Sequence, residues 1–174
     1  DQNMAKKTAT KKKPAAKRRK SKKGVRIALI GAGSRSVSTH YPALSDLPEA
    51  SVVAACDLDE NRLRTACDRF GIPGRYSDYR QMIEREKPDA VYAIMPPHHL
   101  YDVSADIIEH GCHLFVEKPP AVTTEQTRQL TMLAEKHNVL TGVTFQRRFS
   151  PLIRRGKQQC EKRGTVPVSY THLR

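Results

Sequence analysis

The sequence predicts an α/β fold in which helices cover both faces of a doubly wound parallel sheet. Short, unbroken apolar runs alternate with helical patterns between residues 25 and 145. Unbroken apolar runs are typical of strands that are buried on both faces of a parallel sheet. The first run ends in a glycine-rich turn that leads directly into a helical pattern. Strands that alternate with helices in this way favour right-handed βαβ units.

The first half of the predicted domain begins with the apolar run Val25–Ile30, which ends at Gly31. We expect a helix over Ser34–Leu47, bent at Pro42 because proline lacks a backbone N–H. The elements that follow in this half are a strand at Ser51–Cys56, a helix at Asp59–Phe70 and a helix at Asp78–Glu86 that Asp78 caps.

The second half continues the alternation and ends in a basic helix. Its expected elements are a strand at Asp89–Ile94, a helix at Leu100–His110 closed by Gly111, a strand at His113–Val116, a helix at Thr124–His137 capped by Thr123 or Thr124, a strand at Val139–Phe145 and a helix at Pro151–Arg163 ending at Gly164. This pattern divides the chain into a basic tail at 1–23, a dinucleotide-binding domain at 24–146, the start of a connection at 147–166 and an end at 167–174 that we expect to be non-native.

Charge is unevenly distributed along the 174 residues. Residues 4–23 carry eleven Lys and Arg and no acid, whereas residues 24–146 carry twelve basic and sixteen acidic groups, a net charge of −4. We expect the tail to be disordered, either as a solvated segment or as one that contacts nucleic acid weakly and without specificity. The acidic body, which has no Trp, does not favour a specific nucleic-acid-binding protein.

Cysteine usage and hydropathy limit the remaining classes. The four cysteines form no CxxC pair and no zinc-type spacing, so no metal site is expected. No run reaches the roughly 20 apolar residues that span a bilayer, so no membrane partner is expected. Free thiols are typical of a reducing compartment. We therefore expect a cytoplasmic protein, with nuclear targeting by the basic tail as the alternative in a eukaryote.

The first turn, Gly31-Ala32-Gly33-Ser34-Arg35-Ser36, has the pattern of a dinucleotide-binding turn. Gly31 permits a tight turn and Gly33 lets the backbone approach a pyrophosphate, which the helix N-terminus at Ser34 stabilises. The third position is Ser36 rather than glycine, and a small serine still fits there. The turn therefore predicts that Gly31, Gly33, Ser34 and Arg35 contact a cofactor.

Asp57 follows the second strand, twenty-one residues after Ser36. An acid at this place hydrogen-bonds the ribose hydroxyls of a dinucleotide. It favours NAD over NADP, because a 2′-phosphate would meet a like charge. Arg35 and Arg62 leave NADP open, and a helix-capping or turn role is the alternative for Asp57.

Glu117-Lys118-Pro119-Pro120 follows the strand His113–Val116. Lys118 is thereby expected at the carboxyl end of a parallel strand, which is the edge where such sheets bind ligands. An amine at that place can hydrogen-bond a substrate hydroxyl or carbonyl, and desolvation can lower its pKa towards the range of proton transfer.

Together these segments resemble the N-terminal half of the Gfo/Idh/MocA oxidoreductases. The resemblance runs over about residues 24–165 and is carried by VRIALIGAG at 25–33, VAACD at 53–57, IMPPH at 94–98, GCHLFVEKP at 111–119 and RFSP at 148–151. It implies a Rossmann fold, NAD as cofactor with NADP as the alternative, and an enzyme that acts on a sugar, cyclitol or related polyol. It also implies a homo-oligomer and a C-terminal substrate domain, and we expect that this chain is a truncated fragment without that domain.

The resemblance also implies roles for single residues. Lys118 is implied as the catalytic lysine near the nicotinamide, and Glu117 as a neighbour of the nicotinamide ribose. Met95, Pro96 and His98 are implied to lie in the loop beside the cofactor, although the family histidine is replaced here by Leu100. His98 or His99 is the candidate substitute for that histidine, and for each of them an exposed loop position is the favoured alternative. Arg148, after the sixth strand, is implied to reach the active site or the domain junction. A non-catalytic dinucleotide-binding sensor is the alternative function.

Overall fold

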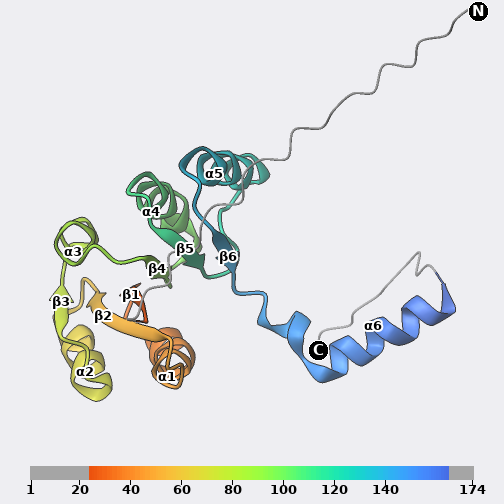
Figure 1. Cartoon of the computed structure of the whole chain (residues 1–174), viewed down its shortest axis with the longest axis horizontal. Helices are drawn as coiled ribbons and strands as arrows, with labels where there is room; N and C mark the ends of the chain where they lie inside the picture. Colours follow the sequence, from red (N-terminus) through yellow and green to blue (C-terminus); the bar gives the residue numbers. More distant parts are fainter. Residues whose placement is uncertain (1–23, 165–174) are drawn as a thin grey trace, which may run out of the picture.

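The computed structural model describes residues 24–164 as a six-stranded sheet with helices on both faces (Figure 1). All five strand pairs are parallel, in the order β3-β2-β1-β4-β5-β6. The strands are β1 (Val25–Ile30), β2 (Ala50–Cys56), β3 (Gly74–Tyr76), β4 (Ala90–Ala93), β5 (His113–Val116) and β6 (Thr141–Val143). This confirms the predicted doubly wound sheet, whose order reverses between β1 and β4. The predictions for 1–23 and 167–174 lie outside the described residues.

Apart from the short helix η2, which the sequence does not predict, the helices agree with the sequence pattern to within a turn. They are η1 (Ser36–His40), α1 (Tyr41–Ser45), α2 (Glu60–Phe70), α3 (Tyr79–Glu86), α4 (Pro97–Glu109), α5 (Thr124–His137), η2 (Gln146–Phe149) and α6 (Pro151–Arg163). Three helices have side-chain caps that accept hydrogen bonds from backbone N–H groups of the first turn: Asp59 caps α2, Asp78 caps α3 and Thr123 caps α5. Helix α4 begins three residues before the predicted start at Leu100, because Pro97 fits the first helical turn, where no N–H is needed.

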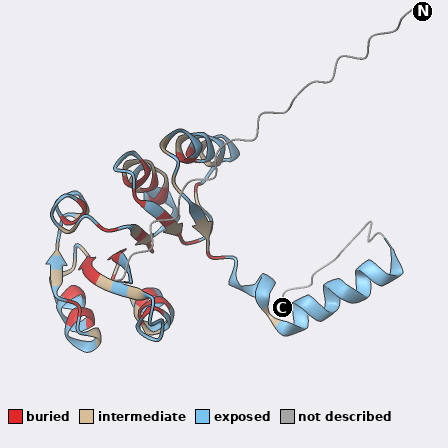
Figure 2. Cartoon of the chain, in the orientation of Figure 1, coloured by how far each residue is buried: buried red, intermediate tan, exposed pale blue. Residues whose placement is uncertain are grey.

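The two faces of the sheet bury separate apolar clusters, and β1 contributes to both. Ala28 and Ile30 pack in the cluster that includes side chains of α3, α4 and α5, whereas Ile27 and Leu29 pack with side chains of α1 and α2. Figure 2 shows this as buried positions on the helix faces that meet the sheet. A fully buried leucine stabilises the fold by about 1.5–3 kcal/mol. Because β1 buries side chains on both faces of the sheet, it contributes such stabilisation to the helix layers on both sides.

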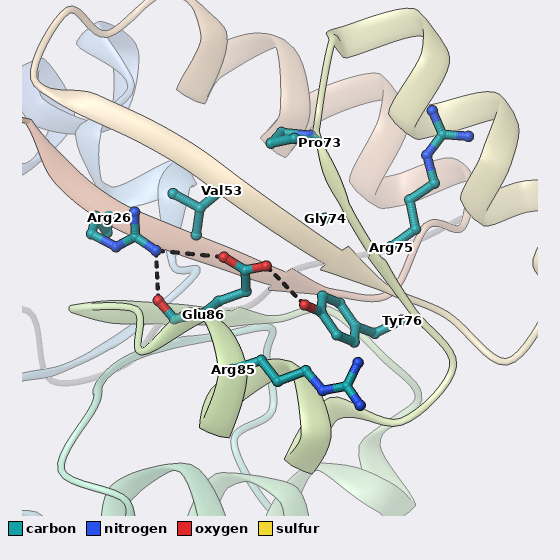
Figure 3. A pocket seen from close by; sticks show the side chains of 8 residues that line it. All are labelled: Arg26, Val53, Pro73, Gly74, Arg75, Tyr76, Arg85 and Glu86. Atoms are coloured by element: carbon teal, nitrogen blue, oxygen red, sulfur yellow. Dashed lines mark hydrogen bonds and ion pairs between the residues drawn. The ribbon is translucent and has the colours of Figure 1, made fainter.

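Strand β3 is a strand that the sequence pattern does not predict. It has only three residues, no apolar run and an edge position, so its pairing with β2 depends on tertiary contacts. Figure 3 shows these contacts: Glu86 accepts a hydrogen bond from Tyr76 (2.8 Å) and its backbone oxygen accepts one from Arg26 (2.5 Å). A Cβ on Gly74 would lie 2.7 Å from the Cβ of Ala54, so glycine permits the close approach.

The pocket drawn in Figure 3 lies beside these contacts, near the amino-terminal part of β1 rather than the carboxyl ends of the strands. Its arginines do not converge on one point: Arg75 pairs with Asp68, Arg26 pairs with Glu86, and Arg85 points away from both in the figure. We therefore interpret this pocket as the structural junction of β1, β2, β3 and α3.

The helical segment after the glycine turn contains one widened turn. Tyr41 N–H bonds the carbonyl oxygen of Ser36, five residues back, which defines the π-helical segment η1. Pro42 follows directly, and its ring and missing N–H disturb the regular ladder. The predicted bend at Pro42 therefore takes the form of an extra residue in the preceding turn.

Helix α6 extends away from the sheet beyond β6 (Figure 1), and all of its residues are exposed (Figure 2). Leu152 and Ile153 are among the exposed large apolar side chains, as are Phe145 and Phe149 just before the helix. The sequence predicts this helix correctly, but the described residues supply no layer that buries its apolar side chains.

Across residues 24–164, no helix is long and apolar enough to cross a bilayer. The same residues contain no group of three or more His, Cys, Asp or Glu side chains arranged to hold a metal ion.

Candidate functional site

The glycine turn at the end of β1 can be built only with glycine at its first position. Gly31 has a φ of +101°, and a Cβ on it would overlap the carbonyl oxygen of Ile94. Its N–H donates to the backbone oxygen of Cys56 at 2.8 Å, which ties the turn to the end of β2. The turn is therefore fixed between the ends of β1, β2 and β4, at the point where the strand order reverses.

Gly33 has the opposite surroundings. A Cβ built on it would meet no atom of another described residue within 4 Å, and the backbone is not in the left-handed region. Helical structure begins at the next residue, Ser34, which is exposed. A turn with open space before a helix N-terminus fits a phosphate group, because free N–H groups and the helix dipole favour an anion there.

Asp57 joins the end of β2 to the glycine turn. Its Oδ2 accepts a hydrogen bond from Ala32 N–H at 2.6 Å, and its Oδ1 accepts one from Asp59 N–H at 2.8 Å. The second contact shows that Asp57 also shapes the turn before α2, while Asp59 is the helix cap. The turn role that the sequence left open for Asp57 is thus present, and the same carboxylate lies at the mouth of the glycine turn, where its contact with a ribose stays a prediction.

Arg62 stands beside this carboxylate on α2. Its guanidinium is 3.7 Å from Asp57 Oδ1 and 3.0 Å from Asp59 Oδ2, and 58% of its side chain is exposed. An exposed ion pair of this kind contributes little to stability, so Arg62 can reorient at low cost.

These residues line one pocket of about 510 Å³ at the carboxyl ends of β1, β2 and β4. The predicted residues that it brings together are Gly31, Gly33, Asp57, Arg62, Met95 and Pro96. Its wall also contains side chains that the sequence did not single out, among them Leu58, Ser77, Tyr79 and Asp102. Tyr79 is held by a 2.7 Å hydrogen bond to Asp106, and burial together with this bond raises its pKa to about 12.

The first turn of α4, directly after the loop that follows β4, contains His98 and His99 and places the second of them in the pocket. Both histidines are exposed, as the sequence alternative expected, but His99 lines the pocket and His98 is not one of its lining residues. The two rings lie 4.1 Å apart between centroids. Leu100, at the position where the resemblance implies a histidine, is fully buried in the core. Leu100 therefore has a packing role, and His99 is the imidazole at the pocket.

Glu117, directly after β5, is a buried carboxylate with several donors around it. Its Oε1 accepts from His40 Nε2 at 3.1 Å and from Arg35 Nε at 3.2 Å, and its Oε2 accepts from Lys118 N–H at 3.0 Å. Burial by itself raises the pKa, but hydrogen bonds from Thr144, His40, Arg35 and the Lys118 backbone outweigh it and lower the pKa to about 2. Glu117 is therefore ionised and fixed to the first helix.

Arg35 is directed to this carboxylate and not to the pocket with Asp57. It lines a separate groove of about 710 Å³ beside β5 and β6. In the orientation of the Gln146 amide that satisfies both of its ends, Arg35 Nη2 also donates to Gln146 at 2.8 Å. The structure therefore separates Arg35 from Arg62, which the sequence had grouped as two arginines that leave NADP open.

Lys118 has a fixed backbone and an exposed side chain. Its N–H is shared between Glu117 Oε2 and Thr144 Oγ1, at 3.0 and 3.1 Å. Within residues 24–164, its amine has no hydrogen bond or ion pair. The amine is thus placed at the carboxyl edge of the sheet and remains available to a ligand.

The residue that sequence reasoning missed at this place is His40. It is 8% exposed and contacts Glu117 across 77 residues of sequence. The only local signal is a polar residue four positions after Ser36, on the buried side of the first helix. Nothing in that pattern identifies Glu117 as its partner.

The comparisons with known proteins agree with this geometry. The model of an oxidoreductase family with an NAD-binding Rossmann fold, GFO_IDH_MocA, matches residues 25–145. The chain belongs to this family. Membership in GFO_IDH_MocA confirms the resemblance and the fold that were predicted from the sequence.

Among relatives, D-glucoside 3-dehydrogenase of Escherichia coli (strain K12) is 30% identical over 126 residues, which cover 72% of this chain and 36% of the relative. A crystal structure of myo-inositol 2-dehydrogenase from Lactobacillus plantarum shares 27% identity with a TM-score of 0.75, and covers 80% of this chain and 42% of that one. An oxidoreductase from Agrobacterium radiobacter, in complex with NAD+, L-tartaric acid and magnesium, shares 25% identity with a TM-score of 0.74 over 79% of this chain and 40% of that one. The chain thus spans about two fifths of the length of these GFO_IDH_MocA proteins.

Proposed function

We propose that this chain binds NAD(H) and is the dinucleotide-binding part of an NAD(P)-dependent oxidoreductase. The enzyme would act on a hydroxyl of a sugar, a cyclitol or a related polyol. The observation that carries the proposal is the contact of Asp57 with Ala32 N–H, which joins an acid at the end of β2 to an open glycine turn. A carboxylate and a phosphate-binding turn in one pocket are what a dinucleotide requires.

Each wall of the pocket has a defined part in this proposal. The turn at Gly33 and the helix start at Ser34 would hold the pyrophosphate, and Asp57 would accept hydrogen bonds from the ribose hydroxyls. Asp57 favours NAD, since it would repel a 2′-phosphate, while Arg62 keeps NADP as the second choice. Met95 and Pro96 form the wall on the side of β4, and His99 is a closer candidate than His98 for a contact there.

Lys118 is the residue that we assign to the chemistry. When bound, the nicotinamide supplies hydride transfer to or from a substrate carbon. The Lys118 amine would hydrogen-bond the substrate oxygen and assist the movement of its proton. Glu117 accepts the His40 hydrogen bond at Oε1, and its Oε2 accepts the hydrogen bond from the Lys118 backbone N–H. We still assign Glu117 to the vicinity of the nicotinamide ribose, through this turn.

Substrate recognition would need a further domain. The matched part of this chain covers only 36% of one relative and 42% of another, and the exposed Phe149, Leu152 and Ile153 offer an apolar surface that such a domain could cover. Sugar and polyol substrates of the relatives support the substrate class. Association into a homo-oligomer is proposed for the complete protein only.

We place the protein in a reducing compartment, the cytoplasm. Cys56, Cys67 and Cys112 are buried free thiols in the described fold, which supports this location. The basic tail is proposed to contact nucleic acid weakly, without a part in the oxidoreductase reaction.

The experiment that tests cofactor binding compares two glycine-to-alanine variants by titration of nicotinamide fluorescence. In Gly33→Ala the added methyl group would enter the space assigned to the pyrophosphate, so the Kd for NADH should rise at least about tenfold, or about 1.4 kcal/mol. Gly156→Ala, in the exposed helix α6, is the matched control because a Cβ there also meets no neighbour within 4 Å. Its Kd should equal that of the unaltered chain.

Two results would contradict the proposal. The unaltered, folded chain could show no binding of NADH or NADPH, or Gly33→Ala could bind as well as the control. If binding is present and the complete protein shows no nicotinamide-dependent turnover with any polyol or sugar, the sensor function replaces the enzyme.

A further inference from the structure

His40 is a buried imidazole whose position is determined by two other features of the fold. Its ring lies edge-on to Tyr92 and Phe115, with centroids 6.2 and 6.4 Å away, so it is enclosed by apolar rings on the sheet side. Its Nε2 points to Glu117 Oε1 at 3.1 Å. A polar group enclosed in this way needs its hydrogen bond, because leaving it unpaired would cost about 1–3 kcal/mol.

The widened turn η1 contributes to this placement. Its Tyr41-to-Ser36 hydrogen bond closes over five residues and puts one additional residue into the turn that ends at His40. Such insertions rotate the residues that follow relative to those that precede. The start of the helix therefore faces the glycine turn, while its next turn directs His40 to the end of β5.

Glu117 contacts both His40 and the backbone of Lys118. One carboxylate oxygen meets the first helix through His40 and Arg35, and the other meets the Lys118 N–H. A carboxylate that is held at both oxygens cannot rotate freely, so its orientation fixes the peptide of Lys118. The helix that begins at the glycine turn is thus joined, through a single side chain, to the lysine at the substrate edge.

We propose that His40 is a positioning residue that holds Lys118 in place through Glu117. This inference rests on the proposed function for its consequence in catalysis, but the coupling itself is a property of this chain. The opposing view is that His40 only fills the space between the helix and Tyr92. That view predicts that its loss loosens the whole layer rather than the Lys118 peptide.

Amide hydrogen exchange of the 174-residue chain, read by NMR, separates the two views. His40→Ala removes one donor to Glu117 Oε1, so Glu117 Oε2 should hold the Lys118 N–H less firmly and leave it mainly to Thr144 Oγ1. Exchange of the Lys118 N–H should then accelerate at least about tenfold, the size of effect that one charge-assisted hydrogen bond has. The neighbouring Glu117 N–H, which donates to Ala93 in the sheet at 3.0 Å, should not change and serves as internal reference. His40→Gln, which keeps an N–H donor near the position of Nε2, should restore slow exchange.

Thr39→Ala is the control variant, since Thr39 is the exposed neighbour of His40 on the same helix. In this variant, exchange of the Lys118 N–H should match that of the unaltered chain. Unchanged Lys118 exchange in His40→Ala would overturn the proposal. Equal acceleration of the Glu117 and Lys118 amides, or failure of His40→Gln to restore protection, would overturn it as well.

In the complete enzyme the same variants should affect turnover much more strongly than cofactor binding. His40→Ala should lower kcat about tenfold or more and change the Kd for NADH less than about threefold, and His40→Gln should recover most of kcat. Equal losses in kcat and in cofactor affinity would refute the positioning role. Absence of NADH binding by the unaltered chain would instead refute the proposed function, and the exchange experiment would still decide the coupling.

Discussion

Replacing Glu117 by glutamine should reveal how much of the stability of this domain depends on one ionised carboxylate. Burial disfavours the charge, yet the hydrogen bonds from Thr144, His40, Arg35 and the Lys118 backbone lower the pKa from 4.5 to about 2. At 1.36 kcal/mol per pKa unit this difference corresponds to about 3 kcal/mol in favour of the ionised form in the folded state. The side chain is only 10% exposed, so screening by solvent removes little of this value.

The sign of the pH dependence follows from the direction of the shift. Because the pKa is lower in the folded state than in the unfolded state, the stabilisation is complete above pH 4.5 and is lost as the pH falls towards about 2. Glutamine resembles the protonated acid. Glu117→Gln should therefore be about 3 kcal/mol less stable at pH 7, and the difference from the unaltered chain should nearly disappear at pH 2–2.5.

Urea unfolding followed by circular dichroism between pH 7 and pH 2.5 measures this difference, with the slope m expected to stay constant. Glu135→Gln is the control, since Glu135 is exposed on α5, and should change stability by less than about 0.5 kcal/mol at every pH. The reasoning is refuted if Glu117→Gln is as stable as the control at pH 7, or if its stability runs parallel to that of the unaltered chain over the whole pH range.

Three further predictions concern the candidate site. Gly31→Ala should lower stability by about 3 kcal/mol, because its Cβ would overlap the Ile94 carbonyl at a φ of +101°; a thermal melt within 1 °C of the unaltered chain would contradict this. Asp57→Ala should weaken NAD binding about tenfold and NADP binding less, as fluorescence titration would show, and an equal loss for both would end the argument for NAD. Lys118→Ala in the complete enzyme should lose turnover and keep its NADH affinity, whereas retained turnover would remove Lys118 from the chemistry.

The elements of this domain follow largely from local pattern. Apolar runs such as Val25–Ile30 and His113–Val116 predict buried strands because both of their faces are apolar. Capping residues such as Thr123 mark where helices begin. Strand β3 does not follow, because three residues without an apolar run become a strand only when Glu86 and the edge of β2 are already in place.

The candidate site divides in the same way. Gly31 and Gly33 can be identified from the spacing of the turn, since it specifies a backbone geometry that few other residues adopt. The partners of charged side chains cannot be identified in this way. The guanidinium of Arg35 contacts Glu117 rather than the pocket at Asp57, and His99, not His98, faces that pocket.

The sequence alone thus determined the alternation of strands and helices, the glycine turn and the lysine at the end of β5, because each depends on residues close in the chain. Only the tertiary structure decided which groups meet across β1, β4 and β5. The contact of His40 with Glu117 spans 77 residues, and it exists because the strand order places β5 two strands from β1 and the widened turn directs the imidazole towards it. Such contacts depend on the packing of layers, which no short stretch of sequence encodes.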